Sequence, residues 1–185
     1  DNGVVIYQGQ QTGGMTDGVM RYQIERTIEA HLDKQRKLLP QGIKVLSLLF
    51  IDRVDNYLIN NEVINQTDGY TRSGKFAQWF EEIYQTLLDK PKYRDLKQQL
   101  AMHYQAEVSE IHNGYFSVDK KGRAKDTSGT TKGDDDTYSL IMKDKEKLLN
   151  LNNPLQFIFS HSALREGWDN PNVFQICTLN ETKST

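Results

Sequence analysis

The hydrophobic pattern near the start of the chain predicts a helix followed by a buried strand. Residues 21–39 carry apolar side chains at helical spacing, and Pro40 and Gly42 end that pattern. Residues 43–51 form a short, almost continuously apolar run, which is typical of a strand buried on both faces of a sheet. A helix followed directly by such a strand indicates an α/β layer.

The same two patterns alternate further along the chain. They predict helices at residues 75–89, 93–104 and 138–149 and strands at residues 155–159 and 173–179. A short helical stretch at 162–166 separates the last two strands. Strand, short helix and strand in close succession predict a mainly parallel sheet.

Two segments lack a clear apolar period. Residues 1–20 hold one apolar run and then many glycines, so we expect an edge strand or a flexible arm there. Residues 119–136 are rich in Gly, Lys, Asp, Ser and Thr, which predicts a mobile surface loop. The length suits a single domain over residues 1–185, and because the first methionine is Met15, we expect a piece of a longer polypeptide.

Composition narrows the class of protein. The chain has a net charge of −2, with 23 basic and 25 acidic residues, so any contact with DNA needs a local basic patch. The sequence contains neither an apolar run of the ~20 residues that span a bilayer nor a signal segment at its start. The single cysteine, Cys177, excludes an internal disulfide and lies in an apolar run, as a buried strand residue does. We therefore expect a cytoplasmic protein.

Residues 69–76 match most of a phosphate-binding loop, with two glycines at the right spacing followed by Lys75. The next position must be Ser or Thr, because its hydroxyl holds the magnesium ion, and here it is Phe76. The preceding residues are also too polar for the buried strand that such a loop follows. We interpret the segment as a surface turn that caps a helix.

No metal or catalytic centre is assigned from the sequence. The four histidines are scattered without the paired spacing of a zinc site. The acidic run at 134–136 lacks the spacing of a calcium loop and falls in the polar segment. No strand-like segment carries the acidic residues and lysine of a nuclease.

Polar side chains gather where the predicted strand at 155–159 ends. Ser160, His161 and Ser162 stand between this strand and the short helix. Ligands bind at the carboxyl ends of parallel strands, where a helix N-terminus offers N–H groups to phosphates. The residues alone leave a second interpretation open, in which a serine N-cap and a glycine C-cap merely enclose one helical turn.

Residues 160–171 resemble motif V of superfamily-two helicases, a strand and Ser/Thr followed by a short helix and Gly-x-Asp. The string at 162–177 is similar to the Res subunits of type III restriction enzymes, and residues 43–57 resemble their motif IV region. Strings at 112–117, 119–122 and 138–146 also match in order, so the resemblance covers roughly residues 21–181.

This resemblance implies an ATP-driven DNA translocase of two RecA-like lobes with ATP and Mg²⁺ at their interface, coupled to an endonuclease. The chain would be the second lobe: an α/β, RecA-like three-layer domain with a mainly parallel sheet and helical or loop insertions around residues 55–136. The implied partners are double-stranded DNA, the first motor lobe of the same chain and a modification (Mod) methyltransferase subunit, in a prokaryotic cytoplasm.

The resemblance also implies roles for single residues. Gly167 and Asp169 match the motif positions near the nucleotide. Ser160, His161 and Ser162 match the region that touches the DNA backbone, in either of two registers one residue apart.

Arg165 is a candidate phosphate contact, with a surface salt bridge to Glu166 or a nearby acid as the alternative. The sequence departs from the family at its end, because motif VI, Gln-x-x-Gly-Arg-x-x-Arg, does not occur before Thr185. We therefore expect this piece by itself not to hydrolyse ATP. The alternatives are a noncatalytic RecA-like interaction domain and the second lobe of another superfamily-two helicase, such as an RNA or repair helicase.

Overall fold

The computed structural model describes residues 17–60, 70–71, 74–116, 145–161 and 173–179. The predicted loop at 119–136 and the predicted helical stretch at 162–166 lie outside these residues, as does most of the predicted arm. Among the described helices, none is long and apolar enough to cross a membrane.

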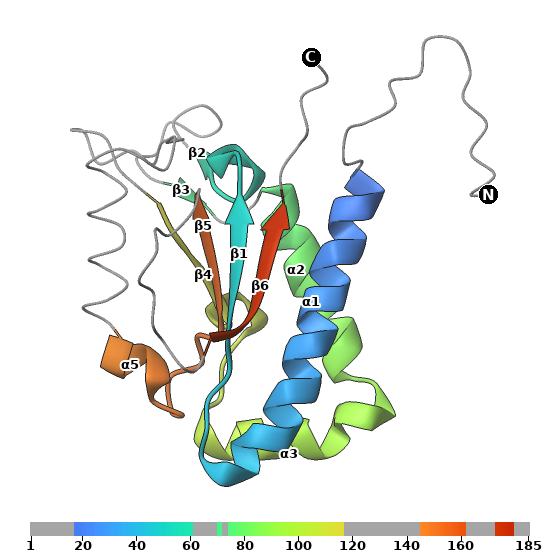
Figure 1. Ribbon diagram of the computed structural model, residues 1–185, viewed down its shortest axis with the longest axis vertical. Helices are drawn as coiled ribbons and strands as arrows, with labels where there is room; N and C mark the ends of the chain where they lie inside the picture. Colours follow the sequence, from blue (N-terminus) through green and yellow to red (C-terminus); the bar gives the residue numbers. More distant parts are fainter. Residues whose placement is uncertain (1–16, 61–69, 72–73, 117–144, 162–172, 180–185) are drawn as a thin grey trace, which may run out of the picture.

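Four strands in the described part of the chain form one fully parallel sheet in the order β4-β5-β1-β6 (Figure 1). The strands of this sheet are β1 (Leu46–Ile51), β4 (His112–Tyr115), β5 (Phe157–His161) and β6 (Val173–Leu179). A separate antiparallel pair consists of β2 (Ile59–Asn60) and β3 (Tyr70–Thr71).

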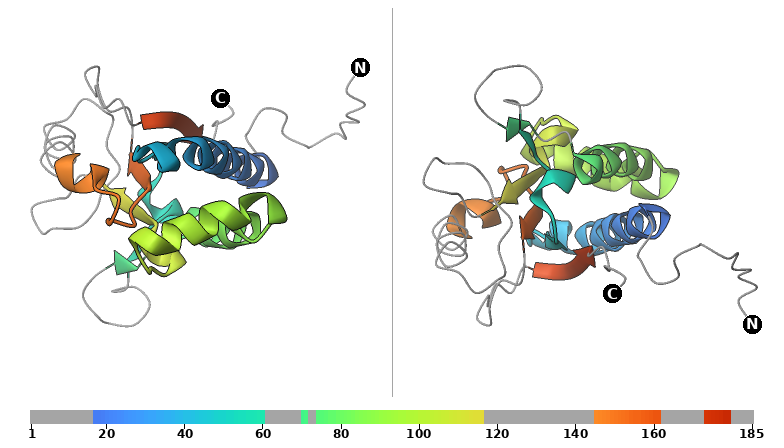
Figure 2. Two further views of the ribbon diagram at one scale, coloured as in Figure 1. Left: turned by 90° about the horizontal axis from the view of Figure 1, so that it is seen from below. Right: turned by 90° about the horizontal axis from the view of Figure 1, so that it is seen from above.

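Helices cover both faces of the sheet. One face carries α1 (Asp17–Leu38) and α2 (Lys75–Leu88), which lie side by side, with α3 (Arg94–His103) at their lower end (Figures 1 and 2). The short α5 (Lys145–Leu149) lies on the opposite face. The predicted α/β, RecA-like three-layer class is confirmed. Single 3-10 turns link these elements: η1 (Leu39–Gln41), η2 (Val54–Asn56), η4 (Pro91–Tyr93) and η5 (Val108–Glu110).

The alternation of side chains along each strand divides the core into two layers. Leu49 of β1 and Phe157 of β5 belong to the large cluster under α1, α2 and α3. Leu48 and Ile158 belong to a smaller cluster with Leu148 of α5. The central strands are therefore buried on both faces, as their continuous apolar runs predicted.

Several boundaries differ from the predicted ones. Helix α1 begins at Asp17, four residues before the predicted start, because Met20 extends its buried stripe. Strand β5 runs to His161, so Ser160 lies inside the strand and not after it. Strand β4 was not predicted, because only His112 among its four residues is buried and its apolar alternation is missing.

Candidate functional site

The carboxyl ends of β1 and β5 lie next to each other at one edge of the sheet. The two strands are parallel, and Ile51, the last residue of β1, pairs in register with His161, the last residue of β5. Asp52 and Arg53 follow β1 directly, so the chain leaves both strands on the same side. This edge is the place where open parallel α/β sheets bind ligands.

Ser160 is only 2% exposed. Its neighbours in register are Phe50 on β1 and Tyr115 on β4. Because its side chain is enclosed, it offers almost no surface to a large ligand. Its predicted contact with DNA stays a prediction, and the same holds for His161, which the structure places at the end of β5.

The other predicted site residues, Ser162, Arg165, Gly167 and Asp169, lie outside the described residues. Their predicted roles stay predictions. The structure does place the two strands that frame them, since β5 ends at His161 and β6 begins at Val173 on the other side of β1.

Arg53 is a candidate site residue that our reading of the sequence did not single out. Its guanidinium forms an ion pair with Asp55, and its side chain is 52% exposed. It lies two residues beyond Ile51, at the same edge as the end of β5. One sequence feature could have identified Arg53. It lies just after a predicted buried strand, within the string that resembles motif IV.

Residues 74–76, at the end of the segment that matches most of a phosphate-binding loop, make packing and surface contacts within the fold. A Cβ atom on Gly74 would lie 2.4 Å from the carbonyl carbon and oxygen of Asn56. Lys75 donates a hydrogen bond of 2.8 Å to Asp17, and Phe76 is fully buried in the core. These residues therefore do not fit a nucleotide's phosphates. Gly74 is the N-cap of α2, in agreement with the predicted helix cap, whereas residues 69, 72 and 73 of the predicted surface turn lie outside the described residues.

Three polar side chains form a chain of hydrogen bonds that runs from Tyr57, after the carboxyl end of β1, to His112 at the amino end of β4. The hydroxyl of Tyr57 lies 2.7 Å from Nδ1 of His112, and Nε2 of His112 lies 3.0 Å from Oε1 of Glu81. Tyr57 and His112 are fully buried, whereas Glu81 on α2 is partly exposed. The chain of bonds connects the loop after β1, strand β4 and helix α2.

A second buried polar network also lies at the amino end of the strands, because Ser47 of β1 and His112 of β4 both pair in register with Phe157. The ring of His31 bonds through Nδ1 to the Ser47 hydroxyl at 2.8 Å and through Nε2 to Oε1 of Gln156 at 3.0 Å. Gln156 also donates a hydrogen bond to the hydroxyl of Tyr104. Burial lowers the pKa of His31 to about 3, so this imidazole is neutral and holds α1 on the sheet.

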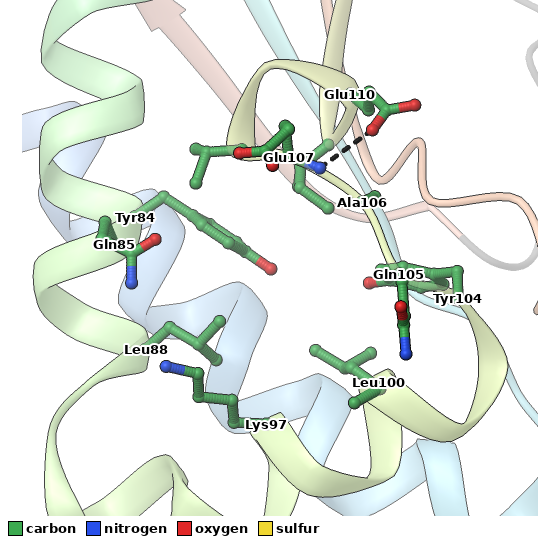
Figure 3. Close-up of a pocket in the computed structure, with 13 residues that line it drawn as sticks. Tyr84, Gln85, Leu88, Lys97, Leu100, Tyr104, Gln105, Ala106, Glu107 and Glu110 are labelled. Carbon is green, nitrogen blue, oxygen red and sulfur yellow. Dashed lines mark hydrogen bonds between the residues drawn. The ribbon is translucent and has the colours of Figure 1, made fainter.

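A groove of about 600 Å³ opens at this amino end, between α2, α3 and η5 (Figure 3). Tyr84 and Leu88 line one side, and Tyr104 lies opposite them. Burial raises the pKa of both tyrosine hydroxyls, so they stay protonated. Ile111, which also lines the groove, directly precedes the first residue of β4. The groove is therefore separate from the candidate edge.

Within the part of the chain that the structure describes, three or more His, Cys, Asp or Glu side chains nowhere gather in a way that could hold a metal ion. Cys177 lies in β6, where burial raises the pKa of its thiol. A thiol with a raised pKa is a poor nucleophile. Among the described residues, the carboxyl ends of β1 and β5 therefore remain the candidate binding edge.

The chain is similar over most of its length to segments of known proteins. No family model matches the chain. It is 36% identical over 185 residues to the type III restriction-modification enzyme EcoP15I Res subunit of Escherichia coli. It is 35% identical over 181 residues to the EcoPI Res subunit of Escherichia phage P1, and 30% identical over 177 residues to the StyLTI Res subunit of Salmonella typhimurium.

These matches cover 97%, 97% and 87% of this chain, respectively. The chain spans only 17% of the length of each of these relatives. The resemblance seen in the sequence is confirmed as similarity to one part of such proteins.

Proposed function

Because this chain is similar over nearly all its length to a segment of type III Res subunits, we propose that it forms part of the ATP-dependent DNA translocase of such an enzyme. In this proposal it is the second RecA-like motor lobe. The observation that carries the proposal is the pairing of Ile51 with His161. This pairing brings together the ends of β1 and β5, the strands proposed to carry motifs IV and V, at the edge where parallel sheets bind ligands.

In this motor the lobe contributes contacts to the DNA backbone. Arg53 offers an exposed guanidinium beside the end of β5, and Arg165 with Ser162 would add contacts from motif V. Phosphate contacts of this kind position a protein on DNA without reading its sequence. Double-stranded DNA is therefore the proposed ligand, and the Mod subunit is the proposed source of sequence recognition.

ATP and Mg²⁺ are proposed to bind between this lobe and the first lobe of the same polypeptide. Gly167 and Asp169 would face the nucleotide from this side. The turn at Gly74 does not fit phosphates, which supports placing the phosphate-binding lysine in the other lobe. The isolated segment is therefore proposed to be inactive, and ATP hydrolysis by it above background would contradict this proposal.

The nucleotide role is tested with Asp169→Ala in the complete Res subunit, assembled with its Mod subunit. We expect DNA-stimulated ATP hydrolysis to fall about tenfold or more, equivalent to at least ~1.4 kcal/mol of transition-state stabilisation. Unchanged hydrolysis would refute the motif V role. If the segment is instead a noncatalytic interaction domain, Asp169→Ala should leave every nucleotide-dependent step unchanged.

The DNA role is tested with Arg53→Ala. We expect weaker DNA binding and a salt dependence reduced by about one released counterion. Arg26→Ala is the matched control, because Arg26 is also an exposed arginine in an ion pair, with Glu29, but it lies on α1. Equal losses in the two variants, or no loss in Arg53→Ala, would argue against a DNA contact at this edge.

A further inference from the structure

Tyr57 ends the loop that follows β1 and fills the core beneath the candidate edge. Its side chain is fully buried, and its ring stacks on Phe159 of β5 with 4.4 Å between the ring centroids. Phe159 lies two residues before His161, at which β5 reaches the edge. One aromatic ring thus contacts β5 and belongs to the segment that follows β1.

The hydroxyl of Tyr57 is held by a defined sequence of partners. The partly exposed Glu81, when ionised, can only accept a hydrogen bond, so Nε2 of His112 donates to it across 3.0 Å. If the His112 ring is neutral, its Nδ1 then accepts from the Tyr57 hydroxyl across 2.7 Å. Glu81 on α2 is therefore connected to the Tyr57 side chain through His112 on β4.

The backbone around the Tyr57 ring leaves room for it because position 114 is a glycine. A Cβ atom on Gly114 would lie 2.7 Å from Cε1 of Tyr57. On the other side of the loop, the N–H of Gly74 donates to the carbonyl of Tyr57 at 3.1 Å. Tyr57 is thus fixed at its ring, its hydroxyl and its backbone.

Arg53 is tied closely to Tyr57. The 3-10 turn η2 spans the residues between them, and the N–H of Asn56 donates to the carbonyl of Arg53 at 3.2 Å. The N–H of Tyr57 donates to the carbonyl of Val54 at 2.9 Å. A shift of the Tyr57 backbone would therefore also shift the backbone of Arg53 beside the end of β5.

We propose that Tyr57, held by His112 and Glu81, is a positioning residue that sets Arg53 against the end of β5 for DNA binding. This inference rests on the proposed function of the lobe. The chain Glu81–His112–Tyr57 couples helix α2 to the DNA-contacting loop. A phenylalanine would fill the same volume and stack on Phe159, so Tyr57→Phe removes only the part of this coupling that the hydroxyl carries.

The test uses Tyr57→Phe in the complete Res subunit assembled with Mod. We expect the DNA concentration for half-maximal ATP hydrolysis to rise about fivefold, the change that corresponds to one lost hydrogen bond. The matched control is Tyr93→Phe, because Tyr93 is also buried and bonds through its hydroxyl to Oδ1 of Asp33 at 2.9 Å. This control should lower the melting temperature by a similar amount and leave the DNA dependence unchanged.

An unchanged DNA dependence in Tyr57→Phe, or an equal shift in Tyr93→Phe, overturns the inference. If Tyr57→Phe does not fold, Glu81→Gln keeps an acceptor for His112 but removes the charge, and a shift in DNA dependence of about twofold is then expected. No shift in that variant also overturns the inference. A wild-type enzyme without DNA-stimulated ATP hydrolysis overturns the proposed function and the inference together, whereas a stimulated wild type with an unaffected Tyr57→Phe removes only the inference.

Discussion

Gly74 lies directly against the backbone of Asn56. A Cβ atom at position 74 would meet the carbonyl carbon and oxygen of Asn56 at 2.4 Å and the nitrogen of Tyr57 at 2.5 Å. Real Cβ atoms essentially never approach backbone this closely. The first turn of α2 therefore begins in contact with the loop after β1, and a glycine is required at the junction. Gly74, which matches the second glycine of a phosphate-binding loop, therefore has a packing role.

Gly74→Ala should lower the free energy of unfolding by about 1–3 kcal/mol or more, because neither backbone segment can give way cheaply. Chemical denaturation of the domain measures this loss. Gly42 provides the contrast, since it has a φ of +73° and nothing within 4 Å of a built Cβ. Gly42→Asn should cost less than Gly42→Ala, because asparagine tolerates the left-handed region, whereas Gly74→Asn should be no better than Gly74→Ala. Equal behaviour at the two positions would contradict the steric explanation.

Lys75→Ala should leave ATP hydrolysis by the complete enzyme within about twofold of the wild-type rate. Lys75 pairs with Asp17 on the surface, and such exposed pairs contribute about 0–1 kcal/mol to stability. Lys92→Ala is the matched control, because Lys92 pairs in the same way with Asp33. A loss of ATP hydrolysis of a hundredfold in Lys75→Ala alone would restore the phosphate-binding interpretation that we reject.

His31 should make the domain less stable as the pH falls below neutrality. Burial lowers its pKa from 6.5 to about 3 in the folded state. Between these values the unfolded chain binds a proton that the folded chain does not, so the free energy of unfolding falls by up to ~1.4 kcal/mol per pH unit. His31→Gln should reduce this slope between pH 6.5 and 3, as measured by denaturation at several pH values.

Ser47→Ala is the control for this experiment. It removes one hydrogen bond of His31 and should cost about 1 kcal/mol at neutral pH. Because the imidazole stays buried, the pH slope should remain close to that of the wild type. If His31→Gln and the wild type have parallel stability curves, burial of a neutral His31 is not the source of the slope.

Lys44 should contribute a pH dependence on the alkaline side. Burial lowers its pKa from 10.5 to about 7, while its ammonium donates to the backbone carbonyls of Asn150 at 3.2 Å and Asn153 at 2.6 Å. Between pH 7 and 10.5 the unfolded chain holds the extra proton, so stability rises with pH, by up to ~1.4 kcal/mol per unit. Lys44→Met should remove this rise, measured by denaturation between pH 7 and 9. If the stability of Lys44→Met still rises with pH in this range, other titratable groups are the cause of the rise.

Most of the secondary structure follows from the sequence. Strand β6 has the predicted bounds, Val173–Leu179, and α2 ends one residue before its predicted end. The apolar runs of β1 and β5 correctly predicted strands buried on both faces. These predictions succeed because an element that buries one or both faces leaves a periodic or continuous apolar pattern in the local sequence.

The candidate edge was predictable only in part. Polar residues near the end of an apolar run indicated the edge at Ser160 and His161, and the adjacent strands support its position. The burial of Ser160 was not visible in the sequence, because it depends on β5 continuing two residues past its apolar run. The place of Arg53 beside this edge depends on which strands pair, and pairing is a long-range property.

The sequence by itself determined that this chain forms a layered α/β domain similar to part of a Res subunit. Only the tertiary structure decided that residues His112–Tyr115 form a strand, since β4 lacks apolar alternation and is held by its pairing with β5. It also decided that Tyr57 bonds to His112, a residue 55 positions away. The physical reason is that periodicity records burial within one element, whereas these contacts come into existence only when separate elements pack together.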